Sequence, residues 1–261
     1  MNAFYKTLKI EKVNPSGIFS ASDDCVVKEE RIAFYLNGKK LLSVMSIPKE
    51  QDYHIVGFLM SEGVIENVKD IQNIEIKGDR VYLDAKIDEA KLQNLFLEKT
   101  LTSGCCVGVA GNLEGNVMQK FVDSNFKVST QKLFLHLREF EKSSELFSLT
   151  GCVHKAMLVL ENATLISEDI GRHNAIDKVM GKAKMQGLFS KNAMLYVSGR
   201  LSLEMVIKAV MHDIPIVVSK AAATYLGIRA AQETGVTLIG FARGESANIY
   251  SHSGRIVGDN L

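Results

Sequence analysis

The second half of the chain alternates between short apolar runs and longer amphipathic stretches, and this alternation limits the fold more than any other feature. Strands are expected at residues 156–160, 164–166, 194–197, 214–218 and 236–241, with a further edge from 248–250 or 255–257. Helices are expected at residues 174–185, 202–211 and 221–234. Strands that alternate with helices predict a layered α/β domain. Ligands of such domains bind beyond the strand ends, at loops that lead into helices.

The first half has a mixed α+β pattern. Asn37-Gly38 separates two strand-like runs, residues 31–36 and 40–45, and this dipeptide is typical of a tight hairpin turn. A second hairpin is expected around Gly78, a helix at residues 49–61, and a longer helix at residues 130–147. A polar stretch at residues 123–129 separates the two patterns. We therefore predict a smaller N-terminal α+β domain, residues 1–125, and an α/β domain, residues 126–261.

Charge and length limit the classes of partner. The 261 residues include 31 Lys and Arg and 30 Asp and Glu, which gives a net charge of +1 and no general attraction to nucleic acid or to an anionic membrane. The first residues lack the apolar core of a signal peptide, and no apolar run is long enough to span a bilayer. We expect a cytoplasmic protein whose four cysteines are mostly reduced, without a disulfide scaffold.

Two adjacent cysteines, Cys105 and Cys106, lie between Gly104 and Gly108. A buried structural cysteine usually occurs in an apolar strand or helix, where it acts as a small hydrophobe. A glycine-lined loop instead lets a partner approach the chain closely, and a thiolate there can attack or carry a sulfur atom. The alternative is that two incidental cysteines occupy a turn, and the local sequence leaves both readings open.

Polar motifs occur where the predicted strands end. His154 lies in a turn before a strand, where it can donate, accept, bind a metal, or form a hydrogen bond at the edge of the core. Residues 168–178 are dense in polar groups yet lead into a helix with an apolar face. They either face an anionic ligand or form a charge network that holds the loop. The candidate ligand-binding residues of this segment are Arg172, His173, Asn174 and Asp177.

Two further segments join glycine to arginine at predicted strand ends. One contains Gly199 and Arg200, and the other comprises Phe241, Ala242, Arg243, Gly244, Glu245 and Ser246. Each signal is weak alone, but the recurrence along one sheet edge suits a polyanion such as a nucleotide pyrophosphate.

These segments together give the chain a resemblance to the FdhD/NarQ family, the formate dehydrogenase accessory sulfurtransferases. The resemblance covers nearly the whole chain and rests on residues 56–65, 101–111, 150–154, 168–178, 198–200 and 238–243. The run Glu-Asp-Ile-Gly-Arg-His-Asn-Ala within residues 168–175 is its most specific part.

The resemblance implies both a fold and a function. The second domain would have a three-layer, cytidine-deaminase-like fold, and the protein would be a homodimer. It would accept persulfide sulfur from a cysteine desulfurase and pass it to the molybdenum cofactor, Mo-bis(molybdopterin guanine dinucleotide), before the cofactor enters formate dehydrogenase. The polar residues given above, His154 among them, would bind the cofactor and its guanine nucleotides, and no permanently bound metal is expected.

The cysteine loop departs from the family pattern, which typically reads Ser-Cys-Gly-Val-Cys-Gly. Cys105 matches the first family cysteine, Gly108 occupies the second cysteine position, and Cys106 replaces a glycine. The sulfur-carrying role therefore transfers to Cys105 by position. Either Cys106 substitutes for the second cysteine, or one cysteine suffices.

Two other functions compete with sulfur transfer. The protein could shelter and hand over the pterin cofactor as a binding module, with incidental cysteines. A zinc deaminase would need His-x-Glu and Pro-Cys-x-x-Cys. Here Lys155 and Ala156 follow His154, and the sequence contains no Cys-x-x-Cys, so the zinc ligand set is incomplete.

Overall fold

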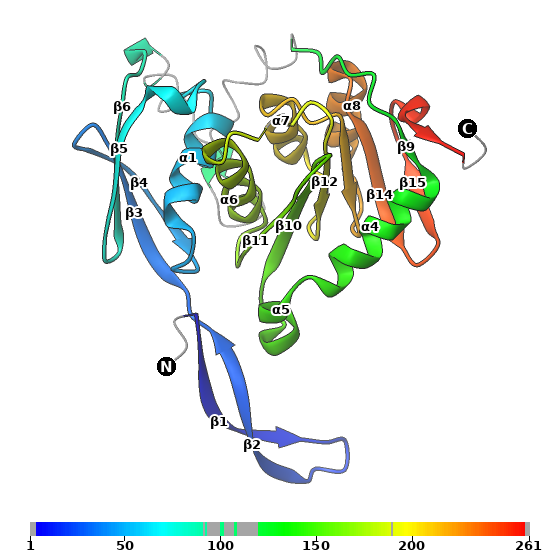
Figure 1. The fold of residues 1–261 in the computed structure, drawn as a ribbon. Coiled ribbons are helices and arrows are strands. Elements are labelled where there is room, and N and C mark those ends of the chain that lie inside the picture. Colours follow the sequence, from blue (N-terminus) through cyan, green and yellow to red (C-terminus); the bar gives the residue numbers. More distant parts are fainter. Residues whose placement is uncertain are drawn as a thin grey trace.

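A computed structural model describes residues 4–90, 92, 100–101, 107–108, 120–188 and 190–258. Within these ranges a six-stranded sheet and a four-stranded sheet form the two halves of the molecule. Figure 1 shows helices α1 (Gln51–Ser61) and α6 (Arg172–Met185) side by side between the two sheets. The predicted mixed α/β fold is confirmed, whereas the specific likeness to cytidine deaminases stays a prediction.

The larger sheet has the order β11-β10-β12-β13-β14-β15, with a parallel centre and antiparallel outer strands. Its strands are β10 (His154–Val159), β11 (Thr164–Asp169), β12 (Met194–Val197), β13 (Ile216–Ser219), β14 (Thr237–Arg243) and β15 (Ser246–Ile249). Successive side chains of a strand point to opposite faces. Leu195 therefore packs with helices α6, α7 (Leu203–Met211) and α8 (Tyr225–Thr234), while Tyr196 packs with α4 (Thr130–Lys142) on the other face.

The smaller sheet has the order β4-β3-β6-β5, and α1 covers one of its faces. Its strands are β3 (Glu30–Leu36), β4 (Lys39–Ser46), β5 (Ile71–Lys77) and β6 (Arg80–Ala85), and a short 3-10 helix, η1 (Val68–Asp70), precedes β5. Asn37, Gly38 and Gly78 all have positive φ angles in the two hairpin turns. Both predicted hairpins are therefore confirmed, and so is the helix expected at residues 49–61.

Helices α1 and α6 cross with their backbones in contact. A Cβ atom added to Gly57 would lie 1.8 Å from the carbonyl oxygen of Asp177, and one added to Gly181 would lie 1.9 Å from that of Tyr53. Only glycine fits at both positions, because any side chain would overlap the facing backbone. This contact joins the two halves, and the predicted division at residues 125 and 126 stays a prediction.

The helix predicted over residues 130–147 is wrong in its length. The structure has two helices there, α4 and then α5 (Glu145–Thr150). The side chain of Ser143 turns back to the carbonyl of Phe140, and that of Ser144 accepts a hydrogen bond from the amide of Phe147. Serine at a helix end competes for backbone hydrogen bonds in this way, so the pair ends one helix and begins the next.

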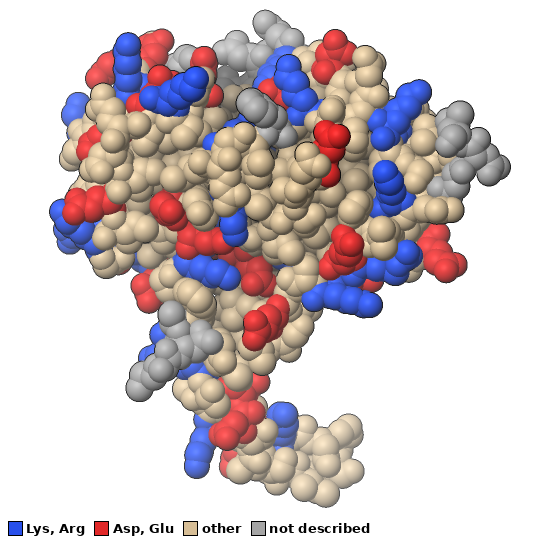
Figure 2. Space-filling view, in the orientation of Figure 1, with Lys and Arg blue, Asp and Glu red and all other residues tan. Residues whose placement is uncertain are grey.

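A long two-stranded arm was not predicted. It consists of β1 (Tyr5–Val13) and β2 (Phe19–Val27), and Figure 1 shows it projecting away from both sheets. Its root packs on Ile47, Leu146 and Val153. The tip is apolar and exposed, with Phe19 65% accessible, and Figure 2 shows no charged side chain there. The tip of the arm therefore presents apolar side chains that the described part of the chain leaves exposed.

Four short strands complete the described chain. β7 (Thr100–Leu101) pairs antiparallel with β8 (Val107–Gly108), and β9 (Val128–Ser129) pairs parallel with β16 (Ile256–Val257), which follows the 3-10 helix η2 (Ser253–Arg255). Cys105 and Cys106 lie outside the described residues. None of the helices within the described ranges is both long and apolar enough to cross a membrane.

Candidate functional site

The predicted site segments meet at one edge of the larger sheet. The register pairs His154 with Asp169, Ala156 with Val197, and Val197 with Ser219. The amino end of β10 therefore lies beside the carboxyl ends of β11, β12 and β13. Residues 198–200 and the start of α6 follow directly from these strand ends. The sheet topology thus brings His154, Arg172, Gly199 and Arg200 to the same edge.

His154 is tied to the loop after β12. Its Nδ1 lies 3.0 Å from Oγ of Ser198, and the same hydroxyl accepts a hydrogen bond from the amide of Lys155 at 3.1 Å. Burial lowers the pKa of His154, and the nearby positive charge of Arg172 lowers it further. The imidazole is therefore held neutral at physiological pH, where it can donate from one nitrogen and accept at the other.

Arg172 lies across Gly199. A Cβ atom at Gly199 would come within 2.7 Å of Cδ of Arg172, so glycine is required for this close approach. Arg172 is also the first residue of α6, whose first turn reads Arg-His-Asn-Ala and so contains no acid. Helix N-termini attract anions, and an arginine adds a charged donor. The start of α6 therefore suits a phosphate group.

The end of β14 presents an aromatic ring and a guanidinium group. The strand pairing with β15 is irregular between Gly240 and Arg243, and Phe241 between them has φ of 51° with 41% of its surface exposed. Positive φ is unusual for a bulky residue, and such strain clusters at functional sites. Arg243 lies 5.7 Å from the Phe241 ring and donates from Nε to the carbonyl of Lys220.

The rest of residues 241–246 differ in exposure. Ala242 is buried in the core beneath the sheet, whereas Gly244 and Glu245 form an exposed turn and Ser246, also exposed, begins β15. A ligand at this segment can therefore contact Phe241, Arg243 and residues 244–246. It can reach only the backbone of Ala242.

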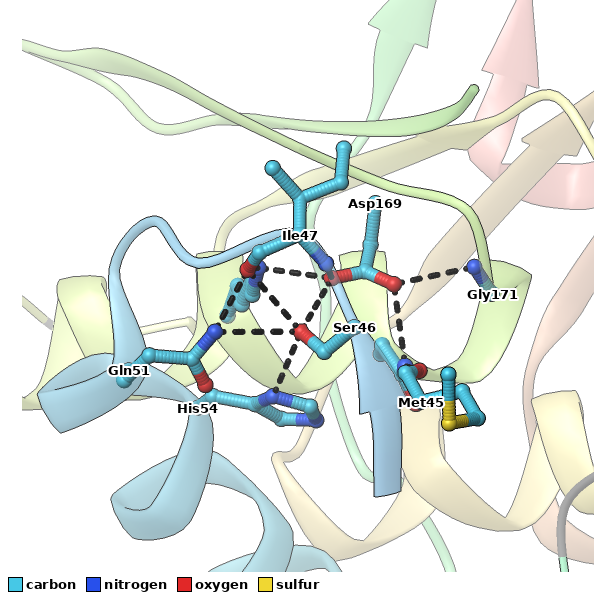
Figure 3. A network of polar contacts seen from close by, with 9 residues as sticks. Met45, Ser46, Ile47, Gln51, His54, Asp169 and Gly171 are labelled. Atoms are coloured by element: carbon cyan, nitrogen blue, oxygen red, sulfur yellow. Dashed lines mark hydrogen bonds and ion pairs between the residues drawn. The ribbon is translucent and has the colours of Figure 1, made fainter. Parts of the chain in front are cut away.

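Asp169 and Lys178 form a buried ion pair that faces the first half of the chain. Their charged atoms lie 2.6 Å apart, and both side chains are inaccessible to solvent. Figure 3 shows Asp169 also accepting hydrogen bonds from the Ser46 hydroxyl at 2.6 Å and the Ile47 amide at 3.2 Å. Burial alone would raise the pKa of Asp169, but the Lys178 charge and the hydrogen bonds from Lys178 and Ser46 hold the pKa below its ordinary value.

Asn174 and Asp177 belong to the same internal contacts. Asn174 donates from Nδ2 to Asp169 and to the carbonyl of Met45, both at 2.9 Å. Asp177 pairs with Lys208 of α7 at 2.7 Å and accepts from the Ser61 hydroxyl at 2.7 Å. Their observed contacts join α1, α6 and α7, and their predicted role in cofactor binding stays a prediction.

Sequence reasoning missed the partners of this network. Ser46, Ser61 and Lys208 are far from residues 168–178 in the sequence, and none lies in a polar motif that points to α6. His54 was missed as well. It is buried against Phe34 with Nδ1 3.5 Å from the Ser46 hydroxyl, and burial, followed by the Lys178 charge, lowers its pKa to about 4.

Comparison with known proteins agrees on one family. Residues 27–257 match the model of the FdhD/NarQ family. A protein of Wolinella succinogenes named sulfur carrier protein FdhD is 58% identical over 256 residues, which cover 97% of this chain and 90% of the relative. The Bacillus subtilis protein of the same name is 34% identical, covering 92% of this chain and 93% of the relative.

A solved structure has the same fold. The crystal structure of a protein described as a formate dehydrogenase accessory protein from Desulfotalea psychrophila superposes with a TM-score of 0.80 at 27% identity. The match covers 97% of this chain and 100% of the other.

Proposed function

The chain belongs to the FdhD/NarQ family, as its motifs indicated, and we propose that it is a sulfur carrier for the molybdenum cofactor. It accepts persulfide sulfur from a cysteine desulfurase and transfers it to Mo-bis(molybdopterin guanine dinucleotide), which then enters formate dehydrogenase. The observation that carries the proposal is the 58% identity, over 97% of the chain, to a protein named sulfur carrier protein FdhD.

The sulfur step uses one thiol and needs no oxidant. The Cys105 thiolate attacks the outer sulfur of the desulfurase persulfide. The S–S bond of the donor breaks, a new S–S bond forms on Cys105, and the donor cysteine leaves as a thiolate. Thiolates are the reactive form in such exchanges, so the rate follows the fraction of Cys105 that is ionised.

The basic sheet edge supports binding of the cofactor as cargo. Its guanine dinucleotide tails carry pyrophosphate groups, and arginine side chains with helix N-terminal amides are typical partners of such groups. Arg172 at the start of α6, Arg200 after β12 and Arg243 at the end of β14 would hold the anionic groups. Gly199 lets Arg172 lie against the loop, and the exposed Phe241 ring offers a surface for a base. Neutral His154 would serve as a polar contact.

A cofactor-binding chaperone is the second candidate. The observation that favours it is that the described edge could bind a nucleotide without any cysteine. Under this alternative a Cys105→Ala protein keeps every function, whereas under the first it keeps nucleotide binding but loses sulfur loading.

The test is intact-protein mass spectrometry after incubation with a cysteine desulfurase and cysteine. We expect the wild type to gain about one sulfur mass that a reductant removes, and Cys105→Ala to gain none. Cys106→Ala decides whether the adjacent pair acts as a unit, and Cys152→Ala, an exposed free cysteine elsewhere, is the matched control. Full loading of Cys105→Ala would refute the sulfur-carrier mechanism.

A homodimer is the proposed assembly, and the β1–β2 arm supports it. A two-stranded ribbon is marginally stable alone, and its two open edges and apolar tip favour pairing with another chain. The arm carries three lysines, Lys6, Lys9 and Lys12, and three acids, Glu11, Asp23 and Asp24. A surface with balanced charge can meet a copy of itself across a two-fold axis without repulsion.

A further inference from the structure

A surface groove of about 610 Å³ lies between the first half of α4 and the turn that joins β14 to β15. Figure 1 shows α4 lying across one face of the larger sheet. Phe134 and Leu135 line the groove together with the charged residues Lys132, Arg138 and Glu245. We call it the α4 groove. Its α4 residues have no part in the proposed cofactor site, so the groove needs a separate explanation.

Leu135 is an apolar side chain that the core does not use. Leu133, Leu137 and Phe140 are buried and pack against the larger sheet. A helix turns by about 100° per residue. Leu135, two residues from both buried leucines, therefore lies on the opposite face of α4, where it is 46% exposed. A single exposed leucine is ordinary, but this one borders a groove beside the half-buried ring of Phe134.

The acids of α4 are engaged within the chain. Glu139 lies 2.8 Å from Nδ1 of His136, and Glu141 lies 2.7 Å from Nζ of Lys220. The first turn of the helix contains no acid. Since the N-terminus of a helix carries a partial positive charge, the start of α4 adds to the positive potential of the groove.

Two cations of the groove are open to a partner. Lys132 and Arg138 are exposed, and they form no ion pair with other described residues. They lie three residues before and three residues after Leu135, and residues at this spacing are neighbours on a helix surface. Each cation therefore lies beside the exposed leucine. Glu245 is the acid among the described lining residues, so the cations outnumber it.

We propose that the α4 groove docks an acidic segment of a partner protein. An apolar side chain of that segment covers Leu135 and Phe134, and carboxylates on either side of it pair with Lys132 and Arg138. Nucleic acid suits the groove less, because its continuous phosphate charge requires a row of cations and the whole chain has a net charge of +1. A second copy of this chain also suits it less, because it would bring the same excess of cations to the contact.

The groove lies beside the proposed cofactor edge. Its Glu245 is two residues from Arg243, which donates to the carbonyl of Lys220, and Lys220 pairs with Glu141 of α4. A partner docked on α4 is therefore held next to the edge at which the cargo is proposed to bind, as a protein that receives the cargo needs to be. This placement rests on the proposed function, whereas the contact itself depends on neither sulfur transfer nor nucleotide binding.

The test is binding of a defined acidic peptide to the full-length protein, measured by fluorescence anisotropy. The probe is a fluorescein-labelled peptide in which glutamates flank one leucine and one phenylalanine, and a second peptide has lysine at every glutamate position. We expect the protein to bind the glutamate peptide about tenfold more tightly than the lysine peptide, and more weakly as added salt screens the charges. Arg138→Glu should weaken binding of the glutamate peptide about tenfold, and Leu135→Ser about fivefold.

A matched charge reversal is the control. Lys39→Glu changes an exposed cation in the β3–β4 hairpin of the smaller sheet, in the other half of the molecule, and should bind the glutamate peptide as the wild type does. Arg138 and Leu135 are also exposed, so both variants should keep the wild-type melting temperature. A loss of peptide binding in them then reports on the groove and not on folding.

Several outcomes overturn the proposal. If the protein binds neither peptide, or binds both equally well, the groove does not select an acidic segment. If Arg138→Glu and Leu135→Ser bind the glutamate peptide as tightly as the wild type, the peptide binds elsewhere. If labelled oligothymidylate binds more tightly and displaces the peptide, or if Leu135→Ser dissociates a dimer in sedimentation measurements, the groove serves nucleic acid or a second copy instead. Sulfur loading of Cys105, measured separately by mass, reports on the proposed function, which stands if docking alone fails.

Discussion

Replacing Glu62 by glutamine is expected to stabilise the protein in a pH-dependent way. Burial raises the pKa of the Glu62 carboxyl, which directly follows α1, from the ordinary 4.5 to about 7. The folded chain therefore favours the protonated carboxyl, and glutamine is a permanently neutral replacement of nearly the same shape. The perturbation removes one ionisation and leaves most of the packing in place.

The magnitude follows from the pKa. A difference of one in pKa is worth 1.36 kcal/mol, so ionised Glu62 costs the folded state about 3 kcal/mol relative to the unfolded chain. A raised pKa contributes stability that is fully present below pH 4.5 and is lost as the pH rises through 7. The Glu62→Gln variant does not lose this stability, because glutamine does not ionise. Its advantage over the wild type should therefore grow from near zero at pH 4.5 to about 2–3 kcal/mol at pH 8.

Because the variant is compared with the wild type, the contributions of other titrating groups to stability cancel. Burial and the Lys178 charge lower the pKa of His54 to about 4, and that group loses stability in the opposite direction, as the pH falls from 6.5. The pKa of His212 is also lowered by burial. Both histidines are present in wild type and variant, so their contributions drop out of the comparison.

The assay is urea denaturation at pH 5, 6, 7 and 8, followed by far-ultraviolet circular dichroism because the chain contains no tryptophan. Glu161→Gln, at an exposed turn, is the control and should show a difference from wild type that does not vary with pH. A stability difference for Glu62→Gln that stays constant from pH 5 to pH 8 would refute the argument.

Three further substitutions test the Asp169–Lys178 ion pair, the contact between α1 and α6, and the β1–β2 arm. Lys178→Met leaves the Asp169 carboxylate buried without its partner and should cost about 3–5 kcal/mol in denaturation experiments, much of it recovered when Asp169→Asn is added. Gly181→Ala places a methyl group against backbone and should cost more than about 2 kcal/mol, whereas Gly254→Ala, with open space around it, should change stability by less than about 1 kcal/mol. Phe19→Asp, at the exposed arm tip, should weaken a dimer about tenfold in sedimentation measurements without lowering the melting temperature, and an unchanged dimer would remove the arm from the interface.

Local sequence signals predicted the elements whose causes are local. The hairpin at Asn37-Gly38 depends on two residues that accept positive φ, and both have it. The helix predicted at residues 130–147 failed for an equally local reason, since Ser143 and Ser144 offered side-chain hydrogen bonds that end a helix. The arm was missed because half of its apolar side chains are exposed, so its strands lack the alternation of a half-buried sheet.

The polar segment at residues 168–178 shows where sequence reasoning stops. Its composition indicated that the side chains must face either a ligand or one another, and the structure shows that Asp169, Asn174, Asp177 and Lys178 make internal contacts. Asp169 and Lys178 form a pair with Ser46 as a further partner, which is more than a hundred residues away in the sequence. A single sequence contains no signal for such long-range pairs, because the fold rather than the local pattern brings them together.

The buried contacts of α6 also fix the position of Arg172 in the candidate site. Helix α6 carries Arg172 at its partly buried start, and the buried pairs and the glycine contact with α1 hold the rest of the helix. A binding group is positioned well only when the element that bears it is itself fixed by packing and hydrogen bonds. If the start of α6 binds the proposed cofactor, the Asp169–Lys178 pair would act on binding without touching the ligand. Breaking it should shift α6 as a unit and weaken phosphate contacts at Arg172, whereas removing Arg243 should weaken binding and leave stability unchanged.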